Sequence, residues 1–311
     1  MNSSFSSTLP NLQLAWDSTS LGALKECPRK YYYSIIQGWS PRVESVHLTF
    51  GQYYHSALEA YDHAKFAGAT HDEATVKAVR RALQDTWNKT LNRPWTSDIK
   101  EKNRETLVRT VVWYLEQFKE DPLQTVRLAN GKPAVELSFR FESGVTAPTG
   151  ENYLLCGHLD RVAMMGDDGW ILDRKTSKYS IDGSEYFERY SPDNQMSMYD
   201  FAGKIVYNLP IRGVIVDAAQ VLITLSRFRR GTVPRTDSTR NEWFNTTTYY
   251  IKMAASYVQD NFWPMNDKSC GMYGGCPFRP ICGRAPEVRE QWLQATFKKR
   301  IWDPLQVRGD I

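Results

Sequence analysis

The sequence lacks any uninterrupted apolar run of about 18 residues, the length that a membrane-spanning helix requires. Its N-terminus, MNSSFSSTLPNLQLAW, also lacks the basic and apolar segments of a secretory signal peptide. No G-x-x-x-x-G-K-[ST] phosphate-binding loop is present, so we expect a chain that binds no ATP and contains no ATP-driven motor. These absences predict a cytoplasmic protein without a membrane partner.

Cysteine is scarce, with five residues among 311. In a cytoplasmic protein we expect so few thiols to be metal ligands, redox groups or buried side chains, because structural disulfides are rare in that compartment. Charge of one sign is not in large excess either, since the formal net charge is +4. Such a balance permits a polyanionic partner but does not require one.

Helical and strand patterns follow one another in a definite order: helices, three strands, a helix, a strand and a helix. This order predicts an α/β fold in which helices flank a mixed central sheet. We expect one domain over residues 1–311, with a helical insertion at 60–130 and a cysteine-rich tail at 264–283. The predicted helices lie at 18–29, 51–66, 72–91, 102–118, 194–207 and 242–262, and the predicted strands at 134–142, 153–163, 169–174 and 213–225.

Two aspartates lie on successive predicted strands, Asp160 in CGHLDRV and Asp173 in WILDRKTSK. Carboxylates that lie close together repel each other unless a cation or a proton lies between them, and two oxygen ligands suit magnesium or manganese. Lys175 shares a strand face with Asp173, where it could offset charge that develops on a phosphate. By itself, an Asp-x-Lys pattern is more often a solvated ion pair on an edge strand.

Two predicted helices carry further polar side chains of interest. His55 stands in G-x-x-x-H-x-x-L-E, and a neutral imidazole is a common ligand of divalent ions. Gln195 and Tyr199 stand at i and i+4, so they share a helix face on which an amide and a phenol could hold a phosphate or a base. Each of these residues, taken alone, is more often ordinary helix surface or core.

Taken in order along the chain, these motifs resemble the RecB-type branch of the PD-(D/E)xK nuclease superfamily. The resemblance runs from about Cys27 to Cys282 and includes Glu136, in the strand that precedes GHLDRV. It implies a restriction-endonuclease-like fold and DNA cleavage that depends on Mg²⁺ or Mn²⁺. The implied metal ligands are His55, Asp160 and Asp173, and the implied catalytic and substrate-positioning residues are Asp160, Asp173, Lys175, Gln195, Tyr199 and Glu136.

Three of the five cysteines, Cys270, Cys276 and Cys282, lie within thirteen residues among glycines and prolines, as in a ligand loop. A tetrahedral sulfur site needs a fourth ligand. Cys27 precedes a proline in a loop-like segment, whereas Cys156 lies in an apolar strand and is the natural buried thiol. Zinc and unligated thiols are the alternatives, although the C-x(2–4)-C spacing of structural zinc sites is absent.

Some RecB-type nucleases, among them AddB-type and CRISPR-adaptation nucleases, hold an iron–sulfur cluster with one N-terminal and three C-terminal cysteines. Cys27, Cys270, Cys276 and Cys282 resemble that arrangement, except that five residues rather than two separate Cys270 from Cys276. The resemblance implies a structural 4Fe-4S cluster. Because such a cluster closes nearly the whole chain into a loop, its binding energy would add to folding stability.

Arginine is concentrated in the segment SRFRRGTVPRTDSTR, which contains Arg227, Arg229, Arg230, Arg235 and Arg240. Gly231 and Pro234 predict a loop in this segment. Guanidinium groups on such a loop would bind backbone phosphates without reading the base sequence, and we expect this of the first four arginines. A solvated loop without a ligand is the alternative.

The sequence therefore predicts a metal-dependent DNA nuclease of a bacterium or its phage, and in particular an exonuclease or DNA-end processing enzyme. The first alternative is a non-catalytic DNA-binding subunit of a helicase–nuclease or recombination complex. A further alternative is an RNA- or small-molecule-processing enzyme that matches the motifs by chance. Asp160, Asp173 and Lys175 are all present, which favours the enzyme, and a helicase or recombination partner would supply the motor that the chain lacks.

Overall fold

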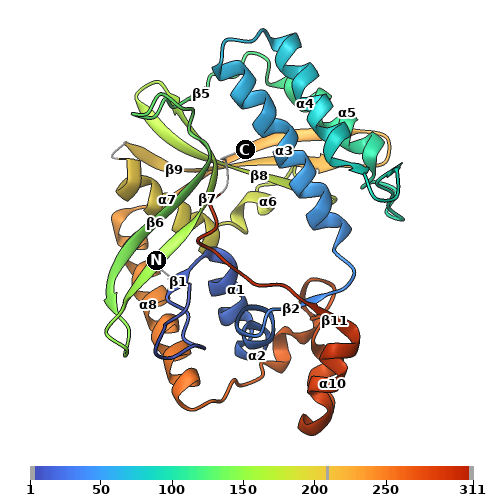
Figure 1. Cartoon of the computed structure of the whole chain (residues 1–311). Helices are drawn as coiled ribbons and strands as arrows, with labels where there is room; N and C mark the ends of the chain where they lie inside the picture. Colours follow the sequence, from blue (N-terminus) through green and yellow to red (C-terminus); the bar gives the residue numbers. More distant parts are fainter. Residues whose placement is uncertain (1–3, 208–209, 308–311) are drawn as a thin grey trace. The chain divides into compact units, whose positions relative to one another are not determined.

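The computed structural model describes residues 4–207 and 210–307, and the chain divides into two compact units made of separate segments (Figure 1). Unit 1 comprises Met1–Val43, Ser138–Gly157 and Thr236–Asp310, and unit 2 comprises Glu44–Leu137 and His158–Arg235. No helix in the described ranges is long and apolar enough to cross a membrane.

The N-terminal half of unit 2 is helical, as the sequence predicts. It contains three helices, and reciprocal capping bonds fix where two of them begin. The second helix begins after the pair Thr70 and Glu73, and the third after the pair Asn103 and Thr106. The buried faces of all three helices form one apolar core with the sheet of this unit. The three helices, which lie side by side in Figure 1, are α3 (Val46–Phe66), α4 (His71–Asp85) and α5 (Arg104–Gln117).

A mixed sheet completes unit 2, which confirms the predicted α/β fold with a central mixed sheet flanked by helices. β8 (Asp168–Ser177) pairs antiparallel with β7 (Asn152–Met165) and parallel with β9 (Ile211–Val221). Parallel neighbours need a crossover connection, and α7 (Asn194–Tyr207) lies within it. The other elements are β5 (Gln124–Thr125) and β6 (Val135–Thr146), which both pair with β7, α6 (Glu185–Glu188), and the pair β3 (Trp87–Asn88) and β4 (Arg93–Pro94). Residues 138–146 of β6 and 152–157 of β7 belong to unit 1.

The prediction of a loop in the arginine-rich segment is wrong. Residues Ser226–Pro234 form β10, which pairs antiparallel with β9 along its whole length. Gly231 suggested a loop, but its small size serves packing, since an added Cβ would clash with the ring of Phe187. Pro234 ends an edge strand, where a missing backbone N–H is tolerated.

The first helix of unit 1 is shorter than predicted. α1 (Ser18–Glu26) ends before Cys27, and α2 (Pro28–Tyr31) begins directly after it. Cys27 itself is extended, with φ −163° and ψ 116°, because the residue before a proline is driven out of the helical region. The proline therefore divides the predicted helix at the cysteine.

The two ends of the chain pack together within unit 1. β11 (Phe297–Lys299) pairs antiparallel with β2 (Trp39–Pro41), and an apolar cluster that includes Tyr33, Phe278 and Leu293 joins the same segments. The other elements are β1 (Ala15–Trp16), which pairs parallel with the first half of β7, a π-helical turn (Tyr32–Ile36), α8 (Asp237–Gln259), a 3₁₀ helix (Asp267–Gly274), α9 (Arg279–Cys282) and α10 (Pro286–Thr296).

Candidate metal centre

Three side chains from three elements of unit 2 form a group that could hold a metal ion. His55 on α3, Glu136 on β6 and Asp160 on β7 offer ligand atoms that all lie within 4.8 Å of one another. Among the described residues, no other group of three or more histidines, cysteines and acids is as tight. Of the predicted ligands His55, Asp160 and Asp173, the group contains the first two together with Glu136.

The strands β7 and β8 separate at this centre. Their pairing ends at Arg161 and Leu172, and Asp160 lies one residue beyond the last pair. Asp160 Oδ2 accepts the Arg174 N–H at 2.7 Å, while its Oδ1 lies 3.3 Å from His55 Nδ1. His55 Nε2 lies 2.8 Å from the Arg174 carbonyl oxygen. An Nε2–H that donates to this carbonyl leaves Nδ1 as the metal-binding atom.

Burial and charge act against each other in the pKa values of this group. Burial raises the pKa of Asp160, but the His55 ring and the Arg174 N–H outweigh it and hold that pKa well below its usual range. Burial lowers the pKa of His55, but the Asp160 carboxylate outweighs it and raises that pKa. Burial and the Asp160 charge raise the pKa of Glu136 to about 7. A divalent cation would relieve the repulsion between the carboxylates, so two carboxylates and an imidazole fit such an ion.

The backbone at Glu136 is also unusual. Its φ is 49°, in the left-handed region, which costs a residue other than glycine about 1–2 kcal/mol. Outliers of this kind cluster at active sites and ligand clamps. The strained backbone at Glu136 thus occurs where its half-buried carboxylate lies beside His55 and Asp160.

A row of hydrogen bonds joins β8 to α7 next to the acids. Lys175 Nζ lies 2.7 Å from Asp173 Oδ2 and donates to Gln195 Oε1 at 2.7 Å. Gln195 Nε2 donates in turn to Tyr199 Oη at 2.9 Å. Burial raises the pKa of Asp173 to about 6 in spite of the Lys175 ammonium group. Burial lowers the pKa of Lys175, but Asp173 outweighs it and raises that pKa, so Lys175 carries a proton at neutral pH.

One residue at the centre has no role in the sequence patterns. The main chain of Arg174 holds both Asp160 and His55 through the bonds described above. In the sequence, Arg174 is marked only by its place between Asp173 and Lys175. Alternate strand residues point to opposite faces, so its side chain is expected on the face opposite to theirs.

The arginines expected to bind phosphate differ in their exposure. Arg227 is exposed and pairs with Asp182 at 2.9 Å, and the exposed Arg229 donates to the carbonyl oxygen of the same residue. Arg235 is half-buried and donates to the Tyr190 carbonyl oxygen at 2.8 Å. Exposed guanidinium groups are therefore found at the start of β10.

Arg230 and Arg240 are enclosed instead. Arg230 Nη1 lies 2.8 Å from Asp121 Oδ1, and its Nε lies 3.1 Å from Asp217 Oδ2. Arg240 is buried and pairs with Asp237 at 2.7 Å. The charge of Arg230 is therefore neutralised by two aspartates within unit 2.

The cysteines predicted as cluster ligands all belong to unit 1. Cys27 Sγ accepts the Asn266 N–H at 3.3 Å, and the Cys276 N–H donates to the Cys270 carbonyl oxygen at 3.0 Å. Burial raises the pKa of Cys276 and Cys282, and the nearby Cys27 thiol raises both further. Within the described ranges, these sulfur atoms do not form a group as tight as the metal centre.

Cys156 is placed differently. It is 1% exposed on β7, and its Sγ donates to the Trp16 carbonyl oxygen at 3.5 Å. Burial raises the pKa of its thiol. The prediction of a buried thiol at this position is confirmed.

A sequence model described as the PD-(D/E)XK nuclease superfamily matches residues 16–283. The chain belongs to this superfamily. The matched range contains the whole metal centre and the row from Asp173 to Tyr199, so both lie within a nuclease domain. Divalent metals are the cofactors of PD-(D/E)XK nucleases, and the donor set at the centre fits such an ion.

Two solved structures are similar to this PD-(D/E)XK chain. A candidate exonuclease from Eubacterium rectale is 12% identical with a TM-score of 0.49, over 88% of this chain and 89% of that chain. The protein SSO0001 is 12% identical with a TM-score of 0.31, over 76% of each chain. At this level of similarity, neither structure carries an argument about activity. No curated protein matches the chain.

Proposed function

We propose that this PD-(D/E)XK protein is a RecB-type, metal-dependent DNA exonuclease or DNA-end processing enzyme. The observation that carries the proposal is a protonated Lys175 beside a three-ligand centre, where its charge acts on both Asp160 and His55. A divalent ion with an adjacent ammonium group is a combination that stabilises the charge developed when a phosphodiester is hydrolysed.

The metal would be Mg²⁺ or Mn²⁺, held by His55, Glu136 and Asp160. Such an ion polarises a phosphate and lowers the pKa of a bound water. Asp173 would join these ligands, since burial and the Asp160 charge raise the pKa of its carboxyl and a divalent cation would relieve the repulsion between the two carboxylates. The His55 Nε2–H bond to the Arg174 carbonyl would keep the ring in the metal-binding tautomer.

Lys175 would donate to a phosphate oxygen or orient the attacking water. Its ammonium group is held between Asp173 and Gln195, which limits the positions that it can take. Tyr199 accepts from Gln195 and fixes the orientation of that amide. The role of this pair would therefore be to position the lysine and the substrate.

DNA would be bound through its backbone. Arg227, Arg229 and Arg235 are the proposed phosphate contacts, and contacts of this kind are independent of base sequence. A helicase or recombination partner would open duplex DNA. The alternative function is a non-catalytic DNA-binding subunit of such a complex.

We further propose that Cys27, Cys270, Cys276 and Cys282 hold a 4Fe-4S cluster. The extended backbone at Cys27 and the electrostatic effect of this thiol on Cys276 and Cys282 support the proposal.

Incubation with linear and with covalently closed circular DNA tests the nuclease. We expect degradation of the linear form only, in Mg²⁺ or Mn²⁺, and none after chelation. Asp160→Asn should lower the rate at least about 100-fold, because a ligand of the ion is lost. Asp168→Asn is the matched control, since Asp168 lies in an exposed ion pair with Arg212. A full rate for Asp160→Asn would overturn the site, and DNA binding without cleavage by the wild type would favour the non-catalytic subunit.

A further inference from the structure

The middle residue of the Asp173-Arg174-Lys175 triplet points away from its two neighbours. Lys175 contacts Asp173 and Gln195 of α7, whereas the Arg174 side chain contacts α3. Arg174 Nη2 lies 2.5 Å from Asp62 Oδ2, and the two side chains are only 2% and 6% exposed. β8 therefore directs one charged side chain into a buried ion pair on its other face.

The main chain of Arg174 bonds two of the three grouped metal ligands. Its N–H donates to Asp160 Oδ2 at 2.7 Å, and its carbonyl oxygen lies 2.8 Å from His55 Nε2. His55 and Asp62 both stand on α3, seven residues apart and so on the same helix face. Two points of α3 thus hold one residue of β8: His55 at its main chain and Asp62 at its side chain.

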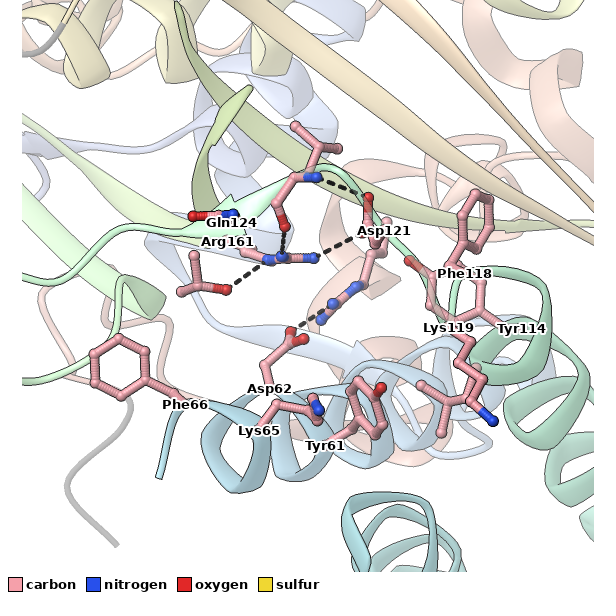
Figure 2. A pocket seen from close by; sticks show the side chains of 14 residues that line it. Tyr61, Asp62, Lys65, Phe66, Tyr114, Phe118, Lys119, Asp121, Gln124 and Arg161 are labelled. Carbon is pink, nitrogen blue, oxygen red and sulfur yellow. Dashed lines mark hydrogen bonds and ion pairs between the residues drawn. The ribbon is translucent and has the colours of Figure 1, made fainter. Parts of the chain in front are cut away.

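Packing alone does not hold the Arg174 side chain. A cavity of about 290 Å³ lies beside the pair, and both Asp62 and Arg174 line it (Figure 2). Figure 2 shows Asp62 projecting from its helix, with a dashed line to the guanidinium group with which it pairs. The cavity would give the arginine room to move if the carboxylate were removed.

A contribution to folding stability does not explain the Asp62–Arg174 ion pair well. Replacing a buried pair by apolar residues of similar size is often neutral or stabilising. Moreover, Arg174 Nε and Nη1 have no hydrogen-bond partner among the described residues, so the burial of this guanidinium group is incompletely compensated there. A role in geometry explains the pair better than a role in stability.

We propose that Asp62 is a positioning residue: through Arg174 it holds the main-chain N–H and carbonyl that orient Asp160 and His55 for metal binding. This inference rests on the proposed function only in assuming that the centre binds a divalent ion. Partners that orient metal ligands from the next layer are worth about 10- to 100-fold in metal affinity.

The test compares Asp62→Asn with Asp121→Asn in the full chain. Both acids line the same cavity and pair with buried arginines, but Arg161 and Arg230, the partners of Asp121, bond it through side chains only. We expect Asp62→Asn to weaken Mn²⁺ binding about 10- to 100-fold in a calorimetric titration. In metal-free protein, the Arg174 amide should exchange its hydrogen at least about tenfold faster. Asp121→Asn should change neither quantity.

Wild-type Mn²⁺ affinity together with wild-type exchange at the Arg174 amide in Asp62→Asn would overturn the inference. If that variant does not fold, the neutral double variant Asp62→Leu with Arg174→Met replaces it, and retained Mn²⁺ affinity there also overturns the inference. A wild type that binds Mn²⁺ but cleaves no DNA defeats the proposed function and leaves this test intact. A wild type that binds no Mn²⁺ overturns both, because the inference assumes that the centre binds a divalent ion.

Discussion

The metal centre and the cysteine region hold their candidate ligands by different means. The ligands of the centre stand on a 21-residue helix and on long strands, and protein groups bond two of them directly. Cys27 lies instead at a break between two short helices, and Cys270 and Cys282 stand on a 3₁₀ helix and a four-residue helix. Short helices have little stability of their own. We therefore expect the centre to form without its metal, and the cysteine region to depend on its cluster.

The largest effect on activity is expected from a change at Lys175, beside the metal centre, which we expect to form without its metal. Lys175→Met should lower the rate of linear DNA cleavage about 10²–10³-fold, as does the loss of one group that stabilises a transition state. Mn²⁺ affinity should stay close to that of the wild type, because Asp160 and His55, two of the three grouped ligands, are bonded by Arg174 rather than by the lysine. Single-turnover cleavage and calorimetry measure the two quantities.

Lys178→Met is the control for that variant, since Lys178 is an exposed lysine three residues further along. It should cleave at the wild-type rate. If Lys175→Met loses metal affinity as strongly as it loses rate, the lysine holds the centre together and the contrast between the two regions is weaker than proposed.

The second prediction compares the two regions by removing their metals. Cys27→Ala should lose iron and colour and lower the Tm by at least about 10 °C, because cluster binding energy becomes folding energy. Chelation of the divalent ion should shift the Tm by only a few degrees. Calorimetric melting and iron analysis measure both effects. Cys156→Ala should keep its iron, and a Cys27→Ala variant with full iron and an unchanged Tm would exclude this thiol as a ligand.

The smallest effect is the pH dependence of the centre. Without metal, the pKa of Glu136 is about 7, so below that pH an ion must displace a proton to bind. The pKa of His55 is raised as well, so its imidazolium holds a second proton that the ion must displace. Mn²⁺ affinity should therefore fall by up to about tenfold per pH unit for each displaced proton as the pH drops below 7. Mn²⁺ titrations across this pH range should show that Glu136→Gln releases one proton fewer on binding than the wild type does. An equal slope of log affinity against pH in the two proteins would remove Glu136 from the ligands.

Local pattern predicted most elements of the fold. The predicted helix at 194–207 coincides with α7, and β7 and β8 extend only a few residues past the predicted strands. The errors have local causes too. Pro28 divides the predicted N-terminal helix at Cys27, and Gly231 and Pro234 suggested a loop where neighbouring strands and side chains support an edge strand.

The sequence by itself determined which chemical groups are present and which of them share a local face. Asp173 with Lys175 on a strand, and Gln195 with Tyr199 on a helix, follow from the repeat of the backbone, which is the same in any fold. Only the tertiary structure decided that Glu136 joins His55 and Asp160, that Asp62 holds Arg174, and that Arg230 is enclosed. These contacts join residues far apart in the chain, and they depend on strand register and helix packing, which no local repeat encodes.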